Sequence, residues 1–190
     1  IRLSLVGSEM CIRDSVYLVQ AWCGDHFTVL DGALYPAWSP DGTQIVFQYF
    51  NPETGQIDGL WLADADGANL HPIEGTQPQD RAPSWSPDGT QIAFESVRDD
   101  VSGIFVLDLE SGAVTPLLTS DELAYEQPAW SPDGTQIAYI VRDIAAAGET
   151  RRLYVVDTEG TSPRHLTDLD NVFSADWSPD STQLAIAAER

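Results

Sequence analysis

The segment Trp38-Ser39-Pro40-Asp41-Gly42-Thr43-Gln44 occurs four times in this chain of 190 residues, with a single change in the last copy. The later copies begin at Trp85, Trp130 and Trp177, so successive copies are 47, 45 and 47 residues apart. Each copy leads into an apolar segment with the residue types of a β-strand, for example Gln91-Ile92-Ala93-Phe94. Strand-type repeats with a period of about 40–50 residues are typical of β-propeller blades, and this period predicts the fold.

The unit from Tyr35 to Arg81 contains the complete repeat. Its Ser39-Pro40-Asp41-Gly42 segment predicts a turn, because Pro suits the second position of a type I turn and Gly tolerates the positive φ needed at its end. A second turn is expected at Asp64-Ala65-Asp66-Gly67. The four strands of this unit are expected at residues 37–38, 44–48, 60–63 and 70–73.

The fold class that follows is all-β, a β-propeller fragment of four-stranded antiparallel blades. Three blades are complete and two are partial. The expected divisions are residues 16–34 for the outer strands of a partial blade, 35–81, 82–126 and 127–173 for complete blades, and 174–190 for the inner strands of a partial blade.

The repeated motif is interpreted as structural. Its Ser-Pro-Asp element could suggest a nucleophile beside a carboxylate, but an enzyme has no use for four copies of one catalytic serine. We expect the Trp side chains to fill the space between blades. The structural residues are Trp38, Pro40, Asp41, Gly42, Trp85, Pro87, Asp88, Gly89, Trp130, Pro132, Asp133, Gly134, Trp177, Pro179 and Asp180.

The last copy has Ser181 where the other three have Gly. A non-glycine residue at positive φ costs roughly 1 kcal/mol. We therefore expect this turn to be the least regular of the four, and Ser181→Gly to stabilise the protein.

Residues 1–15, IRLSLVGSEMCIRDS, have no counterpart in the repeat. They resemble translated sequencing-adapter sequence and are expected to be a non-native leader. Deleting residues 1–15 should leave the melting temperature unchanged, and a large decrease in a thermal denaturation experiment would contradict this interpretation.

The composition is strongly acidic, with 9 Lys and Arg against 30 Asp and Glu and a formal net charge of -21. Nucleic acids and anionic membrane surfaces are bound through clustered Lys and Arg, so neither is an expected partner. No apolar run approaches the ~18 residues of a membrane-spanning helix, and direct membrane insertion is not expected. The two cysteines, Cys11 and Cys23, are too few for a disulfide framework.

No catalytic, cofactor-binding or metal-binding residue is predicted, and the chain is expected not to be an enzyme. It has no Gly-x-Ser-x-Gly segment and no phosphate-binding glycine loop. The segment Asp64–Asn69 superficially resembles a calcium loop, but Gly75 stands where an EF-hand has its Glu and strands are expected on both sides. His26, His71 and His165 are expected in or near the fourth strands of separate blades, too far apart to share a metal.

The pattern from Pro83 to Phe94, which recurs from Pro128 to Tyr139, resembles the WD40-like repeat of TolB-type β-propellers. The resemblance extends from Val16 to Arg190. It implies a ring that usually has six blades and sometimes seven, of which this chain would be a fragment. It also implies a non-catalytic module that binds a protein partner, in the bacterial periplasm or outside the cell. Similar propellers accompany serine peptidase domains and polysaccharide lyases, so the alternative is an accessory or gating propeller of such an enzyme.

The connections that differ between the repeats are the candidate binding surface, because binding residues concentrate on loops held by a rigid scaffold. They fall after the second strand of each unit (residues 49–58, 97–103 and 141–151) and before the first (74–81, 119–126 and 168–173). Small-molecule or glycan binding stays open. Acidic residues in these connections are Asp121, Glu122, Glu126, Asp168 and Asp170.

Overall fold

The computed structural model describes residues 15–19, 26–143 and 150–189. These residues form sixteen β-strands in five antiparallel sheets, and no described residue lies in a helix. Three sheets have four strands and two have two strands. The prediction of an all-β propeller fragment is confirmed.

The strands of each sheet follow one another in chain order. The first two-stranded sheet consists of β1 (Ser15–Val19) and β2 (His26–Asp31). The next sheet contains β3 (Ala33–Trp38), β4 (Gln44–Asn51), β5 (Gln56–Asp64) and β6 (His71–Pro72). It is followed by β7 (Arg81–Trp85), β8 (Gln91–Arg98), β9 (Val101–Asp108) and β10 (Val114–Ser120). The third four-stranded sheet contains β11 (Leu123–Trp130), β12 (Gln136–Asp143), β13 (Arg151–Asp157) and β14 (Arg164–His165). The last sheet pairs β15 (Val172–Trp177) with β16 (Leu184–Ala188).

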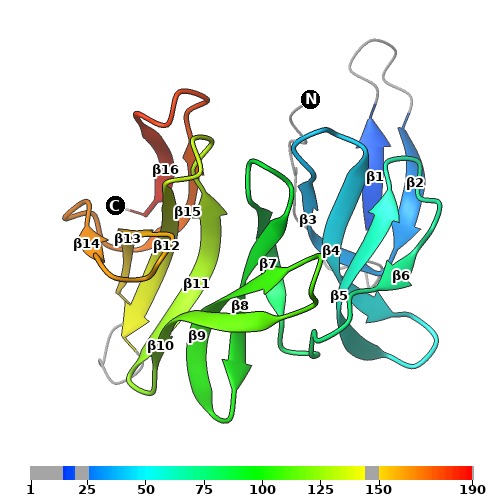
Figure 1. Ribbon diagram of the computed structural model, residues 1–190, viewed down its shortest axis with the longest axis horizontal. Coiled ribbons are helices and arrows are strands. Elements are labelled where there is room, and N and C mark those ends of the chain that lie inside the picture. The colour runs from blue at the N-terminus through cyan, green and yellow to red at the C-terminus, as the bar shows by residue number, and fades with distance from the viewer. Residues whose placement is uncertain (1–14, 20–25, 144–149, 190) are drawn as a thin grey trace.

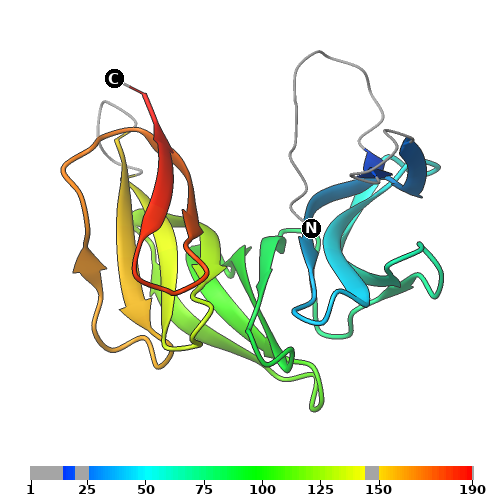
Figure 2. The same ribbon diagram turned by 90° about the horizontal axis from the view of Figure 1, so that it is seen from above.

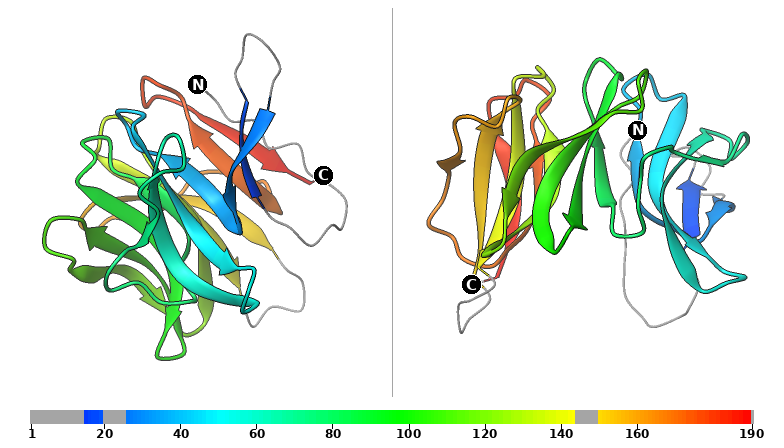
Figure 3. Two further views of the ribbon diagram at one scale, coloured as in Figure 1. Left: turned by 90° about the vertical axis from the view of Figure 1, so that its right-hand side faces the viewer. Right: turned by 60° about the horizontal axis from the view of Figure 1, so that its bottom comes forward.

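The sheets stand side by side in the order of the chain, with the four-stranded sheets between the two smaller ones (Figure 1). Seen from above, they follow an arc whose two ends are the blue and the red sheets (Figure 2). The right-hand view of Figure 3 shows the four-stranded sheets next to one another from a third direction. Each four-stranded sheet therefore has a neighbour on both faces.

The β7–β10 sheet shows how one sequence places apolar side chains against the sheets on both of its faces. Side chains of a strand alternate between its two faces. Phe94 and Leu107 pack toward the β3–β6 sheet, in a cluster that includes Val46. Ala93 and Val106, each next to one of these residues in the chain, pack on the other face with residues of the β11–β14 sheet. Continuous apolar runs in the second and third strands are thus explained by burial on both sides.

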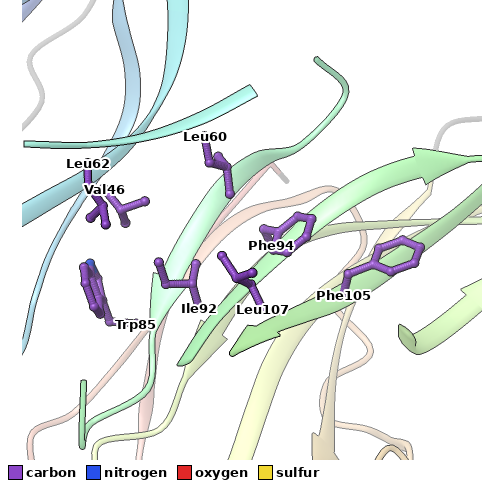
Figure 4. Packing of buried hydrophobic residues seen from close by; sticks show 8 residues of the cluster. All are labelled: Val46, Leu60, Leu62, Trp85, Ile92, Phe94, Phe105 and Leu107. Atoms are coloured by element: carbon purple, nitrogen blue, oxygen red, sulfur yellow. The ribbon is translucent and has the colours of Figure 1, made fainter. Parts of the chain in front are cut away.

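Trp85 lies between the first two four-stranded sheets. Its ring faces Val46 and Leu62 of the neighbouring sheet (Figure 4). Its indole Nε1 donates a hydrogen bond to the carbonyl of Ala37, 3.2 Å away in that sheet. Trp177 repeats the contact at the other end of the array, where its Nε1 donates to the carbonyl oxygen of Ala129 at 3.0 Å.

Several connections are shorter than the sequence suggested. Residues 123–126, expected in a loop, belong to β11, where Leu123 pairs with Asp143. β8 and β9 are joined by Asp99 and Asp100 alone, with φ angles of 52° and 64°. Two residues at positive φ suit the twist of a two-residue hairpin, and Asp tolerates that conformation. The strands can therefore continue to the turn.

The N-terminal boundary also differs by one residue. Ser15, assigned to the leader, begins β1 and pairs with Asp31. Residues 1–14, including Cys11, lie outside the described residues, as does Cys23.

The repeated turns share one hydrogen-bond pattern. In the first copy the Gly42 N–H donates to the carbonyl of Ser39 at 2.9 Å, and the Ser39 hydroxyl donates to the Asp41 carboxylate at 2.7 Å. The backbone N–H of Thr43 donates to the same carboxylate. Gly42 has a φ of 71°, in the region that favours glycine.

The fourth turn keeps this pattern, so the expectation that it is the least regular is wrong. Ser181 adopts a φ of 59°, and its N–H donates to the carbonyl of Ser178 at 2.9 Å. Its hydroxyl also accepts a hydrogen bond from the backbone N–H of Asp133, 3.0 Å away in the preceding turn. This contact between neighbouring turns offsets the unfavourable backbone conformation.

The structure therefore changes the result expected for Ser181. Replacing it by glycine relieves roughly 1 kcal/mol of backbone strain but removes a hydrogen bond that contributes about 0.5–1.5 kcal/mol. Ser181→Gly should leave the free energy of unfolding almost unchanged. Ser181→Ala keeps the strain and loses the bond, so it should be destabilising by about 0.5–1.5 kcal/mol. Urea titrations of both variants test this, and a gain of a full 1 kcal/mol for Ser181→Gly would show that the hydroxyl contributes nothing.

The turn aspartates make stability depend on pH. Hydrogen bonds from the Ser hydroxyl and the Thr N–H lower the pKa of Asp41, Asp88, Asp133 and Asp180 below the ordinary value of 3.8. Their ionised forms are favoured in the folded state, so their contribution is present above pH 3.8 and is lost as the pH falls through the lowered pKa values. The free energy of unfolding, measured in urea between neutral pH and pH 2, should fall on acidification. Asp88→Asn should reduce the fall, and an unchanged slope would contradict the assignment.

Candidate functional site

The connections between strands gather at two opposite ends of the sheets. The motif turns and the hairpins between the third and fourth strands share one end, since the N–H of Ala65 donates to the carbonyl of Thr43 and that of Leu109 to Thr90. We call this the turn end. The hairpins between the second and third strands, and the start of each first strand, lie at the opposite end, which we call the loop end.

Two adjoining hollows of about 510 and 230 Å³ lie at the loop end. They share four lining residues, and we call them together the loop-end hollow. The larger part extends over Val97 to the β4–β5 hairpin, and the smaller part reaches Arg151 and Phe173. The shared residues are Tyr35, Arg81, Glu95 and Glu126.

Glu95 connects two sheets beneath this hollow. Its side chain is 7% exposed and forms an ion pair with Nε of Arg81 in its own sheet. Its other oxygen accepts a hydrogen bond from the backbone N–H of Gln127, 2.6 Å away in the β11–β14 sheet. Burial raises the pKa of Glu95, an effect opposed by the Gln127 N–H and by Arg81. Glu95 therefore holds Arg81 and orients the neighbouring sheet.

Glu126 has the same role for two other arginines. Nε of Arg142 donates a hydrogen bond to its carboxylate at 2.8 Å, and Nε of Arg151 lies 3.3 Å from its second oxygen. The Arg151 guanidinium also lies 5.9 Å from the ring centre of Phe173. Glu126 was predicted as part of an acidic loop, but it lies in a strand and forms ion pairs with these two arginines.

The first strands bend at the hollow. Tyr35, Ala82 and Gln127 have φ angles of 51°, 49° and 50°, and each lies three residues before a motif Trp. The strand pairing is irregular at all three places, as in a β-bulge, which re-aims a side chain. Non-glycine residues in this conformation cost about 1–3 kcal/mol and cluster at functional sites. These bulges were not predicted from the sequence, although Tyr35, Ala82 and Gln127 are each followed by a proline.

Apolar side chains are exposed around the same hollow. Tyr35 is 50% exposed, Val97 47% and Phe173 39%, and Ile57 is also exposed. All four line one of the two parts. Grouped exposed apolar residues mark interaction sites more often than scattered ones do.

A second buried ion pair fastens the segment that leads into the hollow. Asp80 is fully buried, and its carboxylate accepts hydrogen bonds from Arg98 Nη2 at 2.7 Å and from the Ser96 hydroxyl at 2.5 Å. The Arg98 guanidinium lies 5.0 Å from the ring centre of Phe105. Burial raises the pKa of Asp80, and its hydrogen-bond partners oppose the shift. The carbonyl of Asp80 accepts a bond from Gln48 of the preceding sheet, at 3.1 Å.

The other acidic residues singled out in the sequence are not brought to one site. Asp121 and Glu122 are exposed in the turn between β10 and β11. Asp170 pairs with Arg152 at 3.2 Å, and Asp168 is exposed in the same connection. They do not line the loop-end hollow.

The segment Asp64–Asn69 forms a hairpin turn. The N–H of Gly67 donates to the carbonyl of Asp64 at 2.8 Å, and the Asn69 side chain bonds the Asp64 carboxylate. His26 begins β2, while His71 and His165 lie in β6 and β14. Among the described residues, no group of three or more His, Cys, Asp or Glu could hold a metal ion. The same residues include no helix long and apolar enough to cross a membrane.

Solved structures with the same arrangement include proteins of several activities. TolB from Acinetobacter baumannii matches with a TM-score of 0.74 and 22% identity, over 90% of this chain and 42% of that one. A putative TolB from Agrobacterium tumefaciens matches with a TM-score of 0.75 and 21% identity, over 93% of this chain and 66% of that one. An oligogalacturonate lyase in complex with manganese matches with a TM-score of 0.63 and 18% identity, over 90% of this chain and 49% of that one. At these identities the likeness concerns the fold, and the chain spans less than two thirds of each structure.

The sequence itself matches a protein family. No curated protein sequence was found to match the chain. The family model of the TolB beta propeller domain matches residues 25–149. This match covers more than half of the chain and agrees with the repeated sheets, so the protein belongs to the TolB β-propeller domain family.

Proposed function

We propose that this chain is a non-catalytic module that binds a protein partner through its loop end. The observation that carries the proposal is the group of exposed apolar side chains, Tyr35, Ile57, Val97 and Phe173, around the loop-end hollow. Protein interfaces are enriched in aromatic residues and arginine at their centres. The loop end combines both residue types.

The contrast between the two ends supports this assignment. At the turn end, the Ser, Asp and Thr side chains of the motif are used in hydrogen bonds within each turn. At the loop end, the connections differ in length and the strands bend at Tyr35 and Gln127. A rigid scaffold with one variable end is suited to specific binding.

The proposed location is the bacterial envelope, either the periplasm or the outside of the cell. The support is the family and the likeness to TolB structures from two bacteria. The net charge of -21 favours association with partners that are neutral or basic overall.

Affinity capture with matched surface variants tests the proposal. The chain would be used to capture proteins from a bacterial envelope extract, and each captured protein would be purified and its Kd measured. Val97→Asp at the loop end should weaken binding at least tenfold, a change of about 1.4 kcal/mol. Leu70→Asp, a similarly exposed position at the turn end, should have little effect. Equal effects of the two variants, or no purified protein that binds, would contradict the proposal.

The alternative is an accessory or gating propeller of a larger serine peptidase or polysaccharide lyase. It is favoured by the fold shared with the oligogalacturonate lyase and with the tricorn protease, the latter at a TM-score of 0.59 over 16% of that chain. Sequencing the gene beyond the codon for Arg190 distinguishes the two. A Gly-x-Ser-x-Gly segment between a strand and a helix would favour the peptidase.

A further inference from the structure

We propose that the loop-end hollow binds one carboxylate group of an extended segment of the partner protein, through Arg81, Arg142 and Arg151. This inference rests on the proposed protein-binding function and specifies the chemistry of the contact.

All three arginines place Nε next to a glutamate. Nε of Arg81 and of Arg142 donates a hydrogen bond to its glutamate, whereas Nε of Arg151 forms only the 3.3 Å ion pair with Glu126. In the described part of the chain, no hydrogen bond of these residues involves a terminal guanidinium nitrogen. A guanidinium held by Nε can still offer its two terminal nitrogens as a fork that matches a carboxylate.

The glutamates lie deeper than the arginines. The Glu95 and Glu126 side chains are 7% and 13% exposed, whereas Arg81 is 49% exposed. Side chains that hold a binding group from behind fix its orientation and reduce the entropy lost on binding. The cationic groups are therefore set in position before a ligand arrives.

The charged side chains of the hollow favour the binding of one further anionic group. Among the described residues that line the hollow, three guanidinium groups face two carboxylates, which is an excess of one positive charge in a chain of net charge -21. A single entering carboxylate balances this excess. The surrounding negative charge disfavours a segment with further acidic residues. The best match is one carboxylate within a segment that is otherwise neutral or basic.

The walls favour a peptide over a bare anion. The smaller part of the hollow, about 230 Å³, is lined by the buried Ile140 and the exposed ring of Phe173 beside Arg151. These surfaces can contact the methylene groups of a Glu side chain. Val97 and Ile57 extend the apolar surface along the larger part. An extended segment could thus place its acidic residue among the arginines and its neighbours over these side chains.

Binding of paired peptide pools to the full chain tests the inference. Two fluorescein-labelled pools of eight-residue peptides would differ at one central position, Glu in one and Gln in the other, with uncharged residues, Lys and Arg elsewhere. Fluorescence polarisation gives the apparent Kd of each. Hydrogen bonds to a charged group are stronger than those to a neutral amide, so the Glu pool should bind at least about tenfold more tightly than the Gln pool. Equal binding of the pools would overturn the inference.

Variants of the arginines locate the effect. Arg151→Gln should reduce the preference for Glu several-fold, and Arg151→Lys should restore part of it. Because Arg81→Gln alone leaves Glu95 buried without its cation, the double variant Arg81→Gln/Glu95→Gln removes both charges and should also reduce the preference. Arg152→Gln, whose parent side chain pairs with Asp170 outside the hollow, should leave it unchanged. A preference that survives both hollow variants contradicts the inference.

Two further results would separate this inference from the proposed function. The first uses trigalacturonate as a comparison ligand. If it binds in a way that depends on the arginines, and the peptides show no preference for Glu, the hollow binds a sugar acid and the inference is overturned. A purified partner whose binding depends on Val97 but not on Arg81 or Arg151 would support the proposed function and reject the carboxylate anchor.

Discussion

Replacing Trp85 by alanine is expected to lower the free energy of unfolding by about 3–5 kcal/mol, the range for large buried aromatic residues. Trp85 is almost completely buried between the first two four-stranded sheets, against Val46 and Leu62. Truncation leaves a cavity at a sheet–sheet contact and removes the hydrogen bond to the carbonyl of Ala37. A urea titration followed by circular dichroism measures the change.

Trp85→Phe is the matched control. It keeps most of the apolar contact and loses the indole N–H, so the loss should be clearly smaller than for alanine, about 1–2 kcal/mol. A loss below 1 kcal/mol for Trp85→Ala would mean that the sheets do not depend on this contact, and would contradict the interpretation of the motif Trp as structural.

Asp80→Ala is expected to have an effect of similar size, about 3–5 kcal/mol, because removing one member of a buried ion pair leaves the other charge uncompensated. The charge left behind is that of Arg98, whose side chain is 18% exposed. The substitution also removes the acceptor for the Ser96 hydroxyl and the Gln77 N–H.

A double variant distinguishes the ion pair from simple loss of packing. In Asp80→Ala/Arg98→Met neither charge of this pair remains, so this protein should be more stable than Asp80→Ala. Glu110→Ala, at an exposed turn position, should change stability by less than about 0.5 kcal/mol. If Asp80→Ala behaved like Glu110→Ala, the buried pair would have no structural role.

The architecture could be predicted from the sequence because it depends on local signals repeated in register. Each copy of the motif specifies one turn, and each apolar run following it specifies a strand buried on both faces. The spacing of the Trp residues then requires the units to be alike. These signals act within a single unit, so they can be read without knowing how the units are placed.

The candidate site was predicted less well, because it depends on contacts between units. The sequence predicted a binding surface on the variable connections, and some of the residues that line the hollow belong to these connections. The charged groups of the hollow, however, belong to strands: Glu95 to β8, Glu126 to β11 and Arg142 to β12. The hydrogen bond between Glu95 and Gln127 joins residues 32 positions apart, so no local sequence pattern predicts it.

The bulges are an intermediate case. Tyr35, Ala82 and Gln127 each precede a proline, and in the last unit Ala175 stands in the proline position. Ser174, which precedes Ala175, is not among the residues with positive φ. The positive φ thus accompanies the proline, although the first strand of the last unit also has a register shift, between Val172 and Ser174.

In the proposed division of roles, the repeated motif builds the sheets and the loop end binds the partner. Hydrogen–deuterium exchange of the full chain, with and without a purified captured partner, tests it most directly. Binding should slow exchange at residues 95–101 and 123–127 of the loop end and leave exchange at residues 39–43 and 86–90 of the turn end unchanged. Protection of the motif turns, with the loop end unchanged, would contradict it.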